Sequence, residues 1–445
     1  MEKKYFGTDG IRGRVGEGFF SPEFVLKLGW AVGKVLGKKA GAKIIIGKDT
    51  RISSYLIEAC LEAGLSSAGM YVNLVGPMPT PAIAQLTKSL RAEVGVMVSA
   101  SHNPYYDNGI KFFSNDGCKL SDILELEIEK LLSQEIKMAD SHLLGKVKRV
   151  DYVEGRYIEY CKSSFPKNFD LTGYKIVLDC ANGATYKIAP ILFQELGADV
   201  IAIHANPNGT NINDKCGATS PDSLAKAVIE QNADIGLAFD GDGDRLILVD
   251  NKGNIIDGDQ ILYVLAKYNK DIHRDDFKGV VGTVMSNMGL EVALKELNIP
   301  FKRTKVGDRY VFEELINSGW SLGGETSGHI IDLVNATTGD AIIAGLQILT
   351  IMVKQQMSLS NLIKGMIKYP HKIVNITLKD MSLDLNSEKI QNKVKEVEKQ
   401  LGSIGRVVLR KSGTEPKVRV MVEAEDEKLM EQCLNTLVKE VESVI

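Results

Sequence analysis

Short apolar strand patterns alternate with amphipathic helix patterns through most of this chain, and this alternation limits the possible folds most strongly. The segments 43–49, 71–76 and 94–98 have the pattern of buried strands, and the segments 53–70 and 80–90 between them have the pattern of helices. Strands that alternate with helices form mostly parallel sheets with helices on their faces. The sequence therefore predicts an α/β fold.

The strand–helix pattern restarts twice along the chain and then changes. A second round begins with a predicted helix at 151–164, and a third begins with a predicted helix at 258–268. After a break at 369–371, a strand, a helix, two strands and a final helix indicate a small α+β domain. A length of 445 residues suggests about three domains as a prior, but the change of pattern favours four. We place them at residues 1–150, 151–253, 254–366 and 367–445.

The charge balance argues against a general nucleic-acid binder. The net charge is -3, so no basic excess is available to displace the counterions of a polyanion. The six cysteines include no C-x-x-C pair, which is typical of reduced thiols in a cytoplasmic protein. The N-terminal residues MEKKYFGTDG lack the apolar stretch of a signal peptide, and no run of about 18 apolar residues predicts a membrane span. We therefore expect a cytoplasmic protein with neither nucleic acid nor membrane as a partner.

Three carboxylates alternate with glycines in the loop at 240–244, Asp-Gly-Asp-Gly-Asp. On an extended chain, the side chains of Asp240, Asp242 and Asp244 point the same way, and their like charges repel unless a cation is present. Oxygen ligands suit Mg²⁺ or Ca²⁺, but an EF-hand fails because Arg245 and Asn251 occupy the positions of its glycine and its glutamate. A solvated acidic turn is the alternative. The flanking apolar strands favour the metal site.

A second loop, Ser-Ala-Ser-His-Asn-Pro at 99–104, follows the predicted strand at 94–98. It contains no G-x-S-x-G elbow of a hydrolase. On an extended chain the side chains of Ser101 and His102 diverge, so they are not expected to form a serine–base pair. Spacing alone therefore favours a surface or capping serine over a catalytic Ser101. Loops 99–104 and 240–244 both follow the carboxyl ends of strands, where ligands of open α/β sheets bind, so we expect them to face one cleft.

Three further segments carry polar groups whose role the residues alone leave open. Lys111 is either a solvated lysine at the start of a strand or a charge that faces the cleft. The loop Gly-Gly-Glu-Thr-Ser-Gly-His at 323–329 offers groups that bind sugar hydroxyls, with a plain turn as an equal alternative. The segment Arg-Lys-Ser-Gly-Thr at 410–414 can form an anion nest with Arg410 as a forked donor. No Walker A sequence occurs, so this nest would bind a phosphate monoester rather than a nucleotide.

The four loops together resemble the α-D-phosphohexomutase superfamily. The motifs SASHNP, DGDGD, GE-x-SGH and R-x-SGT occur in the order of that family, and the resemblance extends from Phe6 to about residue 425. It implies three similar α/β domains with mixed sheets around a cleft, and a smaller C-terminal α+β domain. It also implies a homodimer as the oligomeric state.

The resemblance implies a role for each matching residue. Ser101 would be a phosphoserine, and Asp240, Asp242 and Asp244 would hold one Mg²⁺ per subunit together with its phosphate. The other implied roles are phosphate contacts from Arg12 and Arg245, proton transfer by Lys111 and His329, sugar binding by Glu325, Ser327, His329 and Asp308, and a phosphate clamp from Arg410, Ser412, Gly413 and Thr414. Serine is a weak nucleophile, and Lys111 would act as its base only with a depressed pKa.

The opening motif FGTDGIRG at 6–13 and the motif KVGDR at 305–309 are similar to the branch of the superfamily that acts on glucosamine phosphates. Hexose-specific members commonly have a histidine where Asp308 stands, whereas Thr326 departs from an expected glutamine. The resemblance implies interconversion of glucosamine 6-phosphate and glucosamine 1-phosphate through a 1,6-bisphosphate, an isomerase activity that would supply UDP-N-acetylglucosamine for cell-wall precursors. The alternatives are a phosphomannomutase or phosphoglucomutase, a metal-dependent sugar phosphatase, or a non-catalytic sugar-phosphate sensor.

Overall fold

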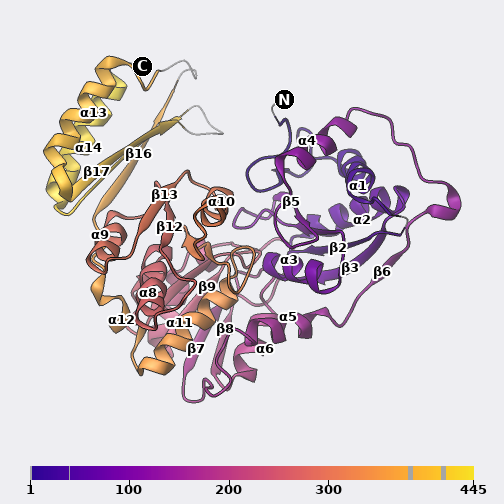
Figure 1. The fold of residues 1–445 in the computed structure, drawn as a ribbon, viewed down its shortest axis with the longest axis horizontal. Helices are drawn as coiled ribbons and strands as arrows, with labels where there is room; N and C mark the ends of the chain where they lie inside the picture. Colours follow the sequence, from indigo (N-terminus) through magenta and orange to yellow (C-terminus); the bar gives the residue numbers. More distant parts are fainter. Residues whose placement is uncertain (1–2, 40, 379–383, 412–416, 445) are drawn as a thin grey trace.

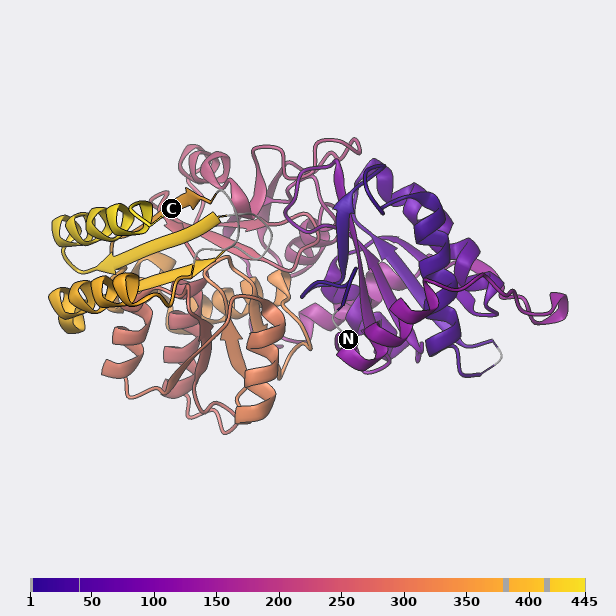
Figure 2. The same ribbon diagram turned by 90° about the horizontal axis from the view of Figure 1, so that it is seen from above.

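The computed structural model describes residues 3–39, 41–378, 384–411 and 417–444, which form four separate β-sheets. Figure 1 shows the sheets in chain order, from the N-terminal sheet through two central sheets to the C-terminal sheet. Figures 1 and 2 agree that the N-terminal and C-terminal sheets lie at opposite ends of the long axis.

The first sheet is mixed and has six strands. They are β1 (Ile11–Arg14), β2 (Lys43–Lys48), β3 (Tyr71–Pro77), β4 (Val94–Val98), β5 (Asp107–Ser114) and β6 (Val147–Arg149), in the order β1-β5-β4-β2-β3-β6. Strands β2, β3, β4 and β6 pair in parallel, whereas β5 is antiparallel to both of its neighbours. The helices of this unit are α1 (Pro22–Leu36), α2 (Ile52–Ser67), α3 (Thr80–Ser89), α4 (Asp122–Leu131) and the short η1 (Ser141–Leu143). The antiparallel β5 carries Lys111 into the centre of the fold, where it is buried.

The second sheet repeats this design with a parallel core and an antiparallel edge. Its strands are β7 (Lys175–Asp179), β8 (Asp199–Ile203), β9 (Ile235–Phe239), β10 (Leu246–Asp250) and β11 (Ile255–Ile256), in the order β11-β10-β9-β7-β8. Its helices are α5 (Val153–Lys162), α6 (Ile188–Glu195), η2 (Gly217–Thr219) and α7 (Asp222–Glu230). Because β9 and β10 pair antiparallel, the chain must reverse direction at residues 240–245. That reversal is the acidic loop.

The third sheet has four strands, and its antiparallel edge again carries a polar loop. The strands are β12 (Val280–Thr283), β13 (Phe301–Thr304), β14 (Leu322–Gly324) and β15 (Ile330–Asp332), in the order β13-β12-β14-β15. The helices are α8 (Gly258–Asp271), α9 (Met288–Glu296), α10 (Asp308–Ser318), α11 (Ala341–Gln355), α12 (Leu359–Leu362) and η3 (Ile363–Gly365). Helix α8 begins with a capping box, in which Asp257 and Gln260 satisfy each other's backbone N–H groups. Residues 325–329 join the antiparallel pair β14–β15.

The C-terminal unit is smaller and has an entirely antiparallel sheet. Its strands are β16 (His371–Thr377), β17 (Gly405–Lys411) and β18 (Lys417–Ala424), in the order β16-β18-β17. Its helices are α13 (Glu388–Leu401), η4 (Gly402–Ile404) and α14 (Glu427–Glu442), and it has a hydrophobic core of its own. Three mixed α/β units and an α+β unit confirm the predicted fold class. The boundaries at 150, 253 and 366 stay predictions.

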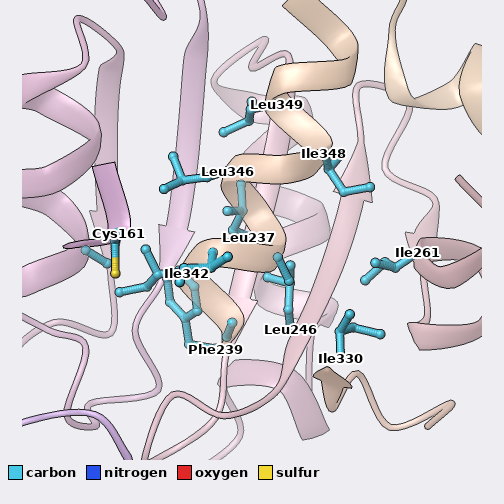
Figure 3. Packing of buried hydrophobic residues seen from close by; sticks show 14 of the residues in the cluster. Cys161, Leu237, Phe239, Leu246, Ile261, Ile330, Ile342, Leu346, Ile348 and Leu349 are labelled. Atoms are coloured by element: carbon cyan, nitrogen blue, oxygen red, sulfur yellow. The ribbon is translucent and has the colours of Figure 1, made fainter. Parts of the chain in front are cut away.

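Helix α11 lies at the centre of the largest hydrophobic core. Figure 3 shows Ile342 and Leu346 on this helix beside Leu237 and Phe239 of β9. The same core extends from Ile45 in the first sheet to Met366 after η3, so the three α/β units share buried surface. This shared core fixes the strand ends that carry the polar loops relative to one another. Among the described residues no single helix has the length and hydropathy to cross a membrane, and only the bent pair of α11 and residues 359–365 meets that criterion together.

Candidate active site

The two loops singled out in the sequence meet at the carboxyl ends of β4 and β9. Ser101 Oγ donates a hydrogen bond of 2.6 Å to Asp240 Oδ2. The buried Arg51 donates to the carbonyl oxygens of Ser101 and Asn103 and pairs with Asp49, which pins the serine loop to the end of β2. The expectation that both loops face one site is confirmed for these two residues.

Ser101 adopts a left-handed backbone conformation, with φ of 53°. The expectation that Ser101 and His102 diverge is therefore wrong, because it assumed an extended chain. Ser101 Oγ lies 3.4 Å from His102 Nδ1. Burial and the guanidinium groups of Arg245 and Arg12 lower the pKa of His102 to about 4, so its imidazole is neutral near pH 7. A strained backbone at a buried serine is a feature of functional sites.

The three aspartates of the acidic loop are buried and converge. One carboxylate oxygen from each of Asp240, Asp242 and Asp244 lies within 4.8 Å of the other two. Among the described residues, Asp242 Oδ1 and Asp244 Oδ1 have no hydrogen-bond partner. Burial, with the charges of Asp244 and Asp242, raises the pKa of Asp240 well above its usual range. Buried carboxylates with unpartnered oxygens fit a hard cation, which would remove their mutual repulsion.

Lys111, on strand β5, brings an ammonium group against these carboxylates. Its Nζ lies 2.8 Å from Asp242 Oδ2, 2.9 Å from Asp244 Oδ2 and 3.1 Å from Asp9 Oδ2. Burial lowers the pKa of Lys111, but Asp242, Asp244 and Asp9 outweigh burial and hold it well above its usual value. The condition set for a lysine base, a depressed pKa, is not met here. In this arrangement Lys111 is a charged donor.

A cavity of about 380 Å³ opens beside the acidic loop, between the first and third α/β units. Its lining includes Arg12, Asp244 and Arg245, together with Asp308, Glu325 and His329 of the third unit. Asp9 pairs with Arg12, and Arg245 Nε lies 3.9 Å from Asp244 Oδ1. The cavity therefore has two guanidinium groups at its wall, which suits a phosphate-bearing ligand.

His329 lies between Asp244 of the acidic loop and Asp308 at the start of α10. Its Nδ1 lies 3.6 Å from Asp244 Oδ1, and its Nε2 lies 3.6 Å from Asp308 Oδ2. Burial lowers the pKa of His329, but Asp244, Asp308 and Glu325 raise it overall. Glu325 is held in place by the backbone N–H of Gly307, 2.9 Å from its Oε1. The structure thus brings His329, Glu325 and Asp308 together, as the sequence predicted.

Two neighbouring residues of the same loop do not join this group. Ser327 is exposed and is not among the described residues that line the cavity. Thr326 Oγ1 turns away and donates to Asp259 Oδ2 at 2.7 Å. The side chain of Thr326 therefore supports the loop from behind, and its departure from the expected glutamine does not alter the cavity wall.

Arg410 lies in the C-terminal sheet, away from the main cavity. It lines a second cavity of about 320 Å³ with Arg419, Asn375 and Met285. Burial and the neighbouring Arg419 lower the pKa of Arg410. The other residues of the predicted clamp, Ser412, Gly413 and Thr414, lie outside the described residues.

The sequence analysis missed two charged residues of the site. Asp9 pairs with Lys111, Arg12 and Lys119, although it lies inside the recognised motif at 6–13. Lys119 pairs with Asp9 of the first unit and Asp308 of the third unit, and both carboxylates line the cavity. The position of Asp9 within that motif is the sequence signal that could have indicated its role. Nothing in the sequence distinguishes Lys119 from a surface lysine, because its burial depends on the packing of two domains.

Models of one known protein family match the chain over most of its length. The models of phosphoglucomutase/phosphomannomutase α/β/α domains I, II and III match residues 3–138, 155–253 and 257–369, and the model of the C-terminal domain matches residues 373–440. The chain belongs to the phosphoglucomutase/phosphomannomutase family. This confirms the resemblance to the phosphohexomutases that the four motifs indicated.

Individual relatives cover the whole chain. The phosphoglucosamine mutase of Aeromonas hydrophila is 56% identical over 444 residues, which is 100% of both chains. A phosphoglucomutase/phosphomannomutase family protein from Burkholderia thailandensis has a similar fold, with a TM-score of 0.82 at 24% identity, over 99% of this chain and 97% of the other. The N-acetylphosphoglucosamine mutase of Aspergillus fumigatus, solved with GlcNAc-6P and magnesium, gives a TM-score of 0.70 at 18% identity, over 100% and 96% of the two chains.

Proposed function

We propose that this chain interconverts glucosamine 6-phosphate and glucosamine 1-phosphate, as a phosphoglucosamine mutase does. The proposal is supported by the 56% identity to the Aeromonas enzyme of that name over the full chain. The structural observation that carries it is the hydrogen bond of 2.6 Å from Ser101 Oγ to Asp240 in the buried acidic loop. A nucleophilic hydroxyl beside a metal-binding carboxylate set is what a phosphoserine intermediate requires.

Asp240, Asp242 and Asp244 would hold one magnesium ion. Magnesium would supply charge stabilisation for the phosphoryl group and would take up part of the carboxylate charge that now faces Lys111. Hard oxygen ligands and two carboxylate oxygens without hydrogen-bond partners support this assignment. The magnesium in the Aspergillus mutase complex gives it further support.

The phosphoryl group would move twice. In the first step the bond from Ser101 Oγ to phosphorus would break as a bond from phosphorus to O1 of glucosamine 6-phosphate forms, while the proton of O1 passes to a base and Ser101 Oγ takes up a proton. The resulting 1,6-bisphosphate would turn within the site and return its 6-phosphoryl group to Ser101, whose hydroxyl loses its proton while O6 of the sugar takes one up, and glucosamine 1-phosphate leaves. Arg12 and Arg245 on the wall of the cavity would balance the moving charge, since they need no reorganisation during the reaction.

Proton transfer would fall to Lys111 and His329. Both are buried, and both lie beside Asp244. Lys111 can act as a base only after its pKa falls. A cation that shares the charges of Asp242 and Asp244 would lower that pKa. His329 stands 3.6 Å from carboxylates on either side and would exchange protons between the loop and the sugar.

Recognition of the amino group would depend on Asp308 and Glu325. Both carboxylates line the same cavity as the two arginines, so a ligand that carries both a phosphate and an ammonium group would meet groups of opposite charge there. The clamp formed by Arg410, Ser412, Gly413 and Thr414 would hold the phosphate that is not reacting. A C-terminal unit with its own core could move as a body to bring the clamp to the cavity. We also propose a homodimer in the cytoplasm.

Coupled assays on glucosamine, glucose and mannose phosphates test the substrate. We expect the purified chain, with magnesium and a trace of sugar 1,6-bisphosphate as activator, to have its highest kcat/KM for the glucosamine phosphates. A preference for glucose 1-phosphate would show a phosphoglucomutase instead. Steady release of inorganic phosphate without isomerised sugar would show a phosphatase.

A further inference from the structure

Asp179, His204 and Cys216 converge in the second α/β unit, at the carboxyl ends of β7 and β8. Asp179 is the last residue of β7, His204 follows β8 directly, and Cys216 precedes η2. One carboxylate oxygen, one imidazole nitrogen and the thiol sulfur of these residues all lie within 4.8 Å of one another. The cluster is built from three loops that the sheet brings together, and the proposed reaction uses none of its members.

The protein contacts of the cluster leave ligand positions open. Asp179 accepts one backbone hydrogen bond on each oxygen, from Ala181 N at 2.9 Å and from Gly217 N at 2.8 Å. A carboxylate has about four lone-pair positions, so roughly two remain. His204 Nδ1 lies 3.1 Å from Asp179 Oδ2, yet among the described residues this buried nitrogen has no partner with hydrogen-bond geometry. Cys216 is fully buried, and its sulfur accepts a weak contact of 4.0 Å from Asn182 Nδ2.

The backbone holds His204 in an uncommon conformation that aims its ring at the other two residues. Its φ is 46°, in the left-handed region that favours glycine. Its side chain is 31% exposed, whereas that of Asp179 is fully buried. The imidazole is therefore the member of the cluster that faces solvent. In this conformation the imidazole places a nitrogen within 4.8 Å of both a carboxylate oxygen of Asp179 and the thiol sulfur of Cys216, which is a spacing that one metal ion can span.

We propose that Asp179, His204 and Cys216 form a second metal site, for Zn²⁺ or a similar borderline-soft divalent ion. The ligands would be an Asp179 carboxylate oxygen, His204 Nδ1 and Cys216 Sγ, with water as the fourth. Oxygen, nitrogen and sulfur donors in this combination suit tetrahedral zinc, whereas magnesium prefers the all-oxygen loop at 240–244. Binding would convert the Cys216 thiol to a thiolate, and the thiol proton, with any proton on His204 Nδ1, would pass to solvent.

This site lies directly behind the acidic loop. Ala184 N donates to Gly241 O at 2.8 Å, and a Cβ on Gly183 would lie 2.4 Å from the same oxygen. A Cβ on Gly217 would lie 2.5 Å from Phe239 O, at the end of β9. The loops that carry the Zn²⁺ ligands therefore pack without spare space against the backbone that positions Asp240. An ion at the cluster would brace that layer and stabilise the native state by binding it in preference to the unfolded chain.

Cobalt titration tests the proposal, because Co²⁺ replaces Zn²⁺ and shows a sulfur-to-metal charge-transfer band when a thiolate binds it. The full chain is first stripped with chelator and then saturated with Mg²⁺. We expect one equivalent of Co²⁺ to bind with this band, and Zn²⁺ to displace it. The band should be lost in Cys216→Ser, while Cys433→Ser, which removes another fully buried thiol in the C-terminal unit, should keep it.

His204→Gln provides a second test, because its part-exposed side chain is the least costly of the three to replace. It should weaken Co²⁺ binding and abolish the rise in Tm that Zn²⁺ gives the wild type. Absence of the band in the wild type would overturn the proposal and leave Asp179–His204 as a plain ion pair. A band of equal strength and affinity in His204→Gln and in a folded Cys216→Ser would overturn it as well.

Discussion

Replacement of Lys111 by methionine should destabilise the protein most when magnesium is absent. Lys111 Nζ lies within 2.8–3.1 Å of three carboxylates, and its side chain is only 3% exposed. Removing one partner of a buried ion pair costs about 3–5 kcal/mol, because the remaining charge is left without compensation. Here three carboxylates lose one shared ammonium, so we expect the upper part of that range. A fall in Tm on the order of 10 °C follows for a domain of this size.

Magnesium should restore much of this stability, because a divalent ion would replace the lost positive charge. The assay is thermal unfolding of Lys111→Met and wild type, each in chelator and in saturating Mg²⁺ at one neutral pH. Lys302→Met is the control, since Lys302 also pairs with a carboxylate at 2.8 Å but is 47% exposed, and it should change little in either condition. An equal fall in Tm for Lys111→Met with and without magnesium would refute the reasoning. The ammonium group and the ion would then not compensate the same carboxylate charges.

Three other substitutions test separate parts of the site. Arg410→Ala should raise KM about tenfold to a hundredfold, as loss of a charge-assisted phosphate contact does, and leave Ser101 phosphorylation intact; unchanged KM with lost phosphorylation would contradict the clamp. Asp308→His should lower the ratio of activity on glucosamine phosphate to activity on glucose phosphate, and an unchanged ratio would remove Asp308 from substrate recognition. His329→Gln should lose stability mainly at low pH. Because folding raises the pKa of His329, its contribution is complete below the pKa of an unfolded histidine, about 6.5, and disappears as pH rises through the raised value. Urea unfolding at a series of pH values measures the difference in free energy of unfolding between wild type and His329→Gln. A difference that grows as pH rises would contradict the prediction.

The sequence predicted the regular elements well wherever apolar runs were bounded by clear turn residues. The predicted strand at 94–98 matches β4 residue for residue. The predicted helix at 53–70 is shorter in the structure and ends at Ser67, because Gly69 turns the chain with φ of 95° toward β3. Helix α1 was not predicted, although Ser21 and Pro22 carry the start signals of a helix.

The sequence indicated which residues come together at the site better than it indicated the contacts between them. The alternating carboxylates indicated a cation, and the structure brings Asp240, Asp242 and Asp244 within reach of one ion. The charge state of Lys111 could not be predicted, since it depends on three carboxylates from distant parts of the chain. The contact between Ser101 and His102 depends on a left-handed φ that no residue type at 101 signals. Pairings across domains, such as Lys119 with Asp308, follow only from tertiary packing.

Intact-mass analysis of the purified wild type and Ser101→Ala tests the central claim most directly. Ser101 Oγ lies against Asp240 in a buried site, so this hydroxyl is the group that should carry the phosphoryl intermediate. We predict that the wild type, purified in buffer free of phosphatase, carries a phosphate adduct. Ser101→Ala should lack this adduct. A phosphate adduct of the same mass that persists on Ser101→Ala would contradict the account, because the phosphoryl group would then reside on another residue.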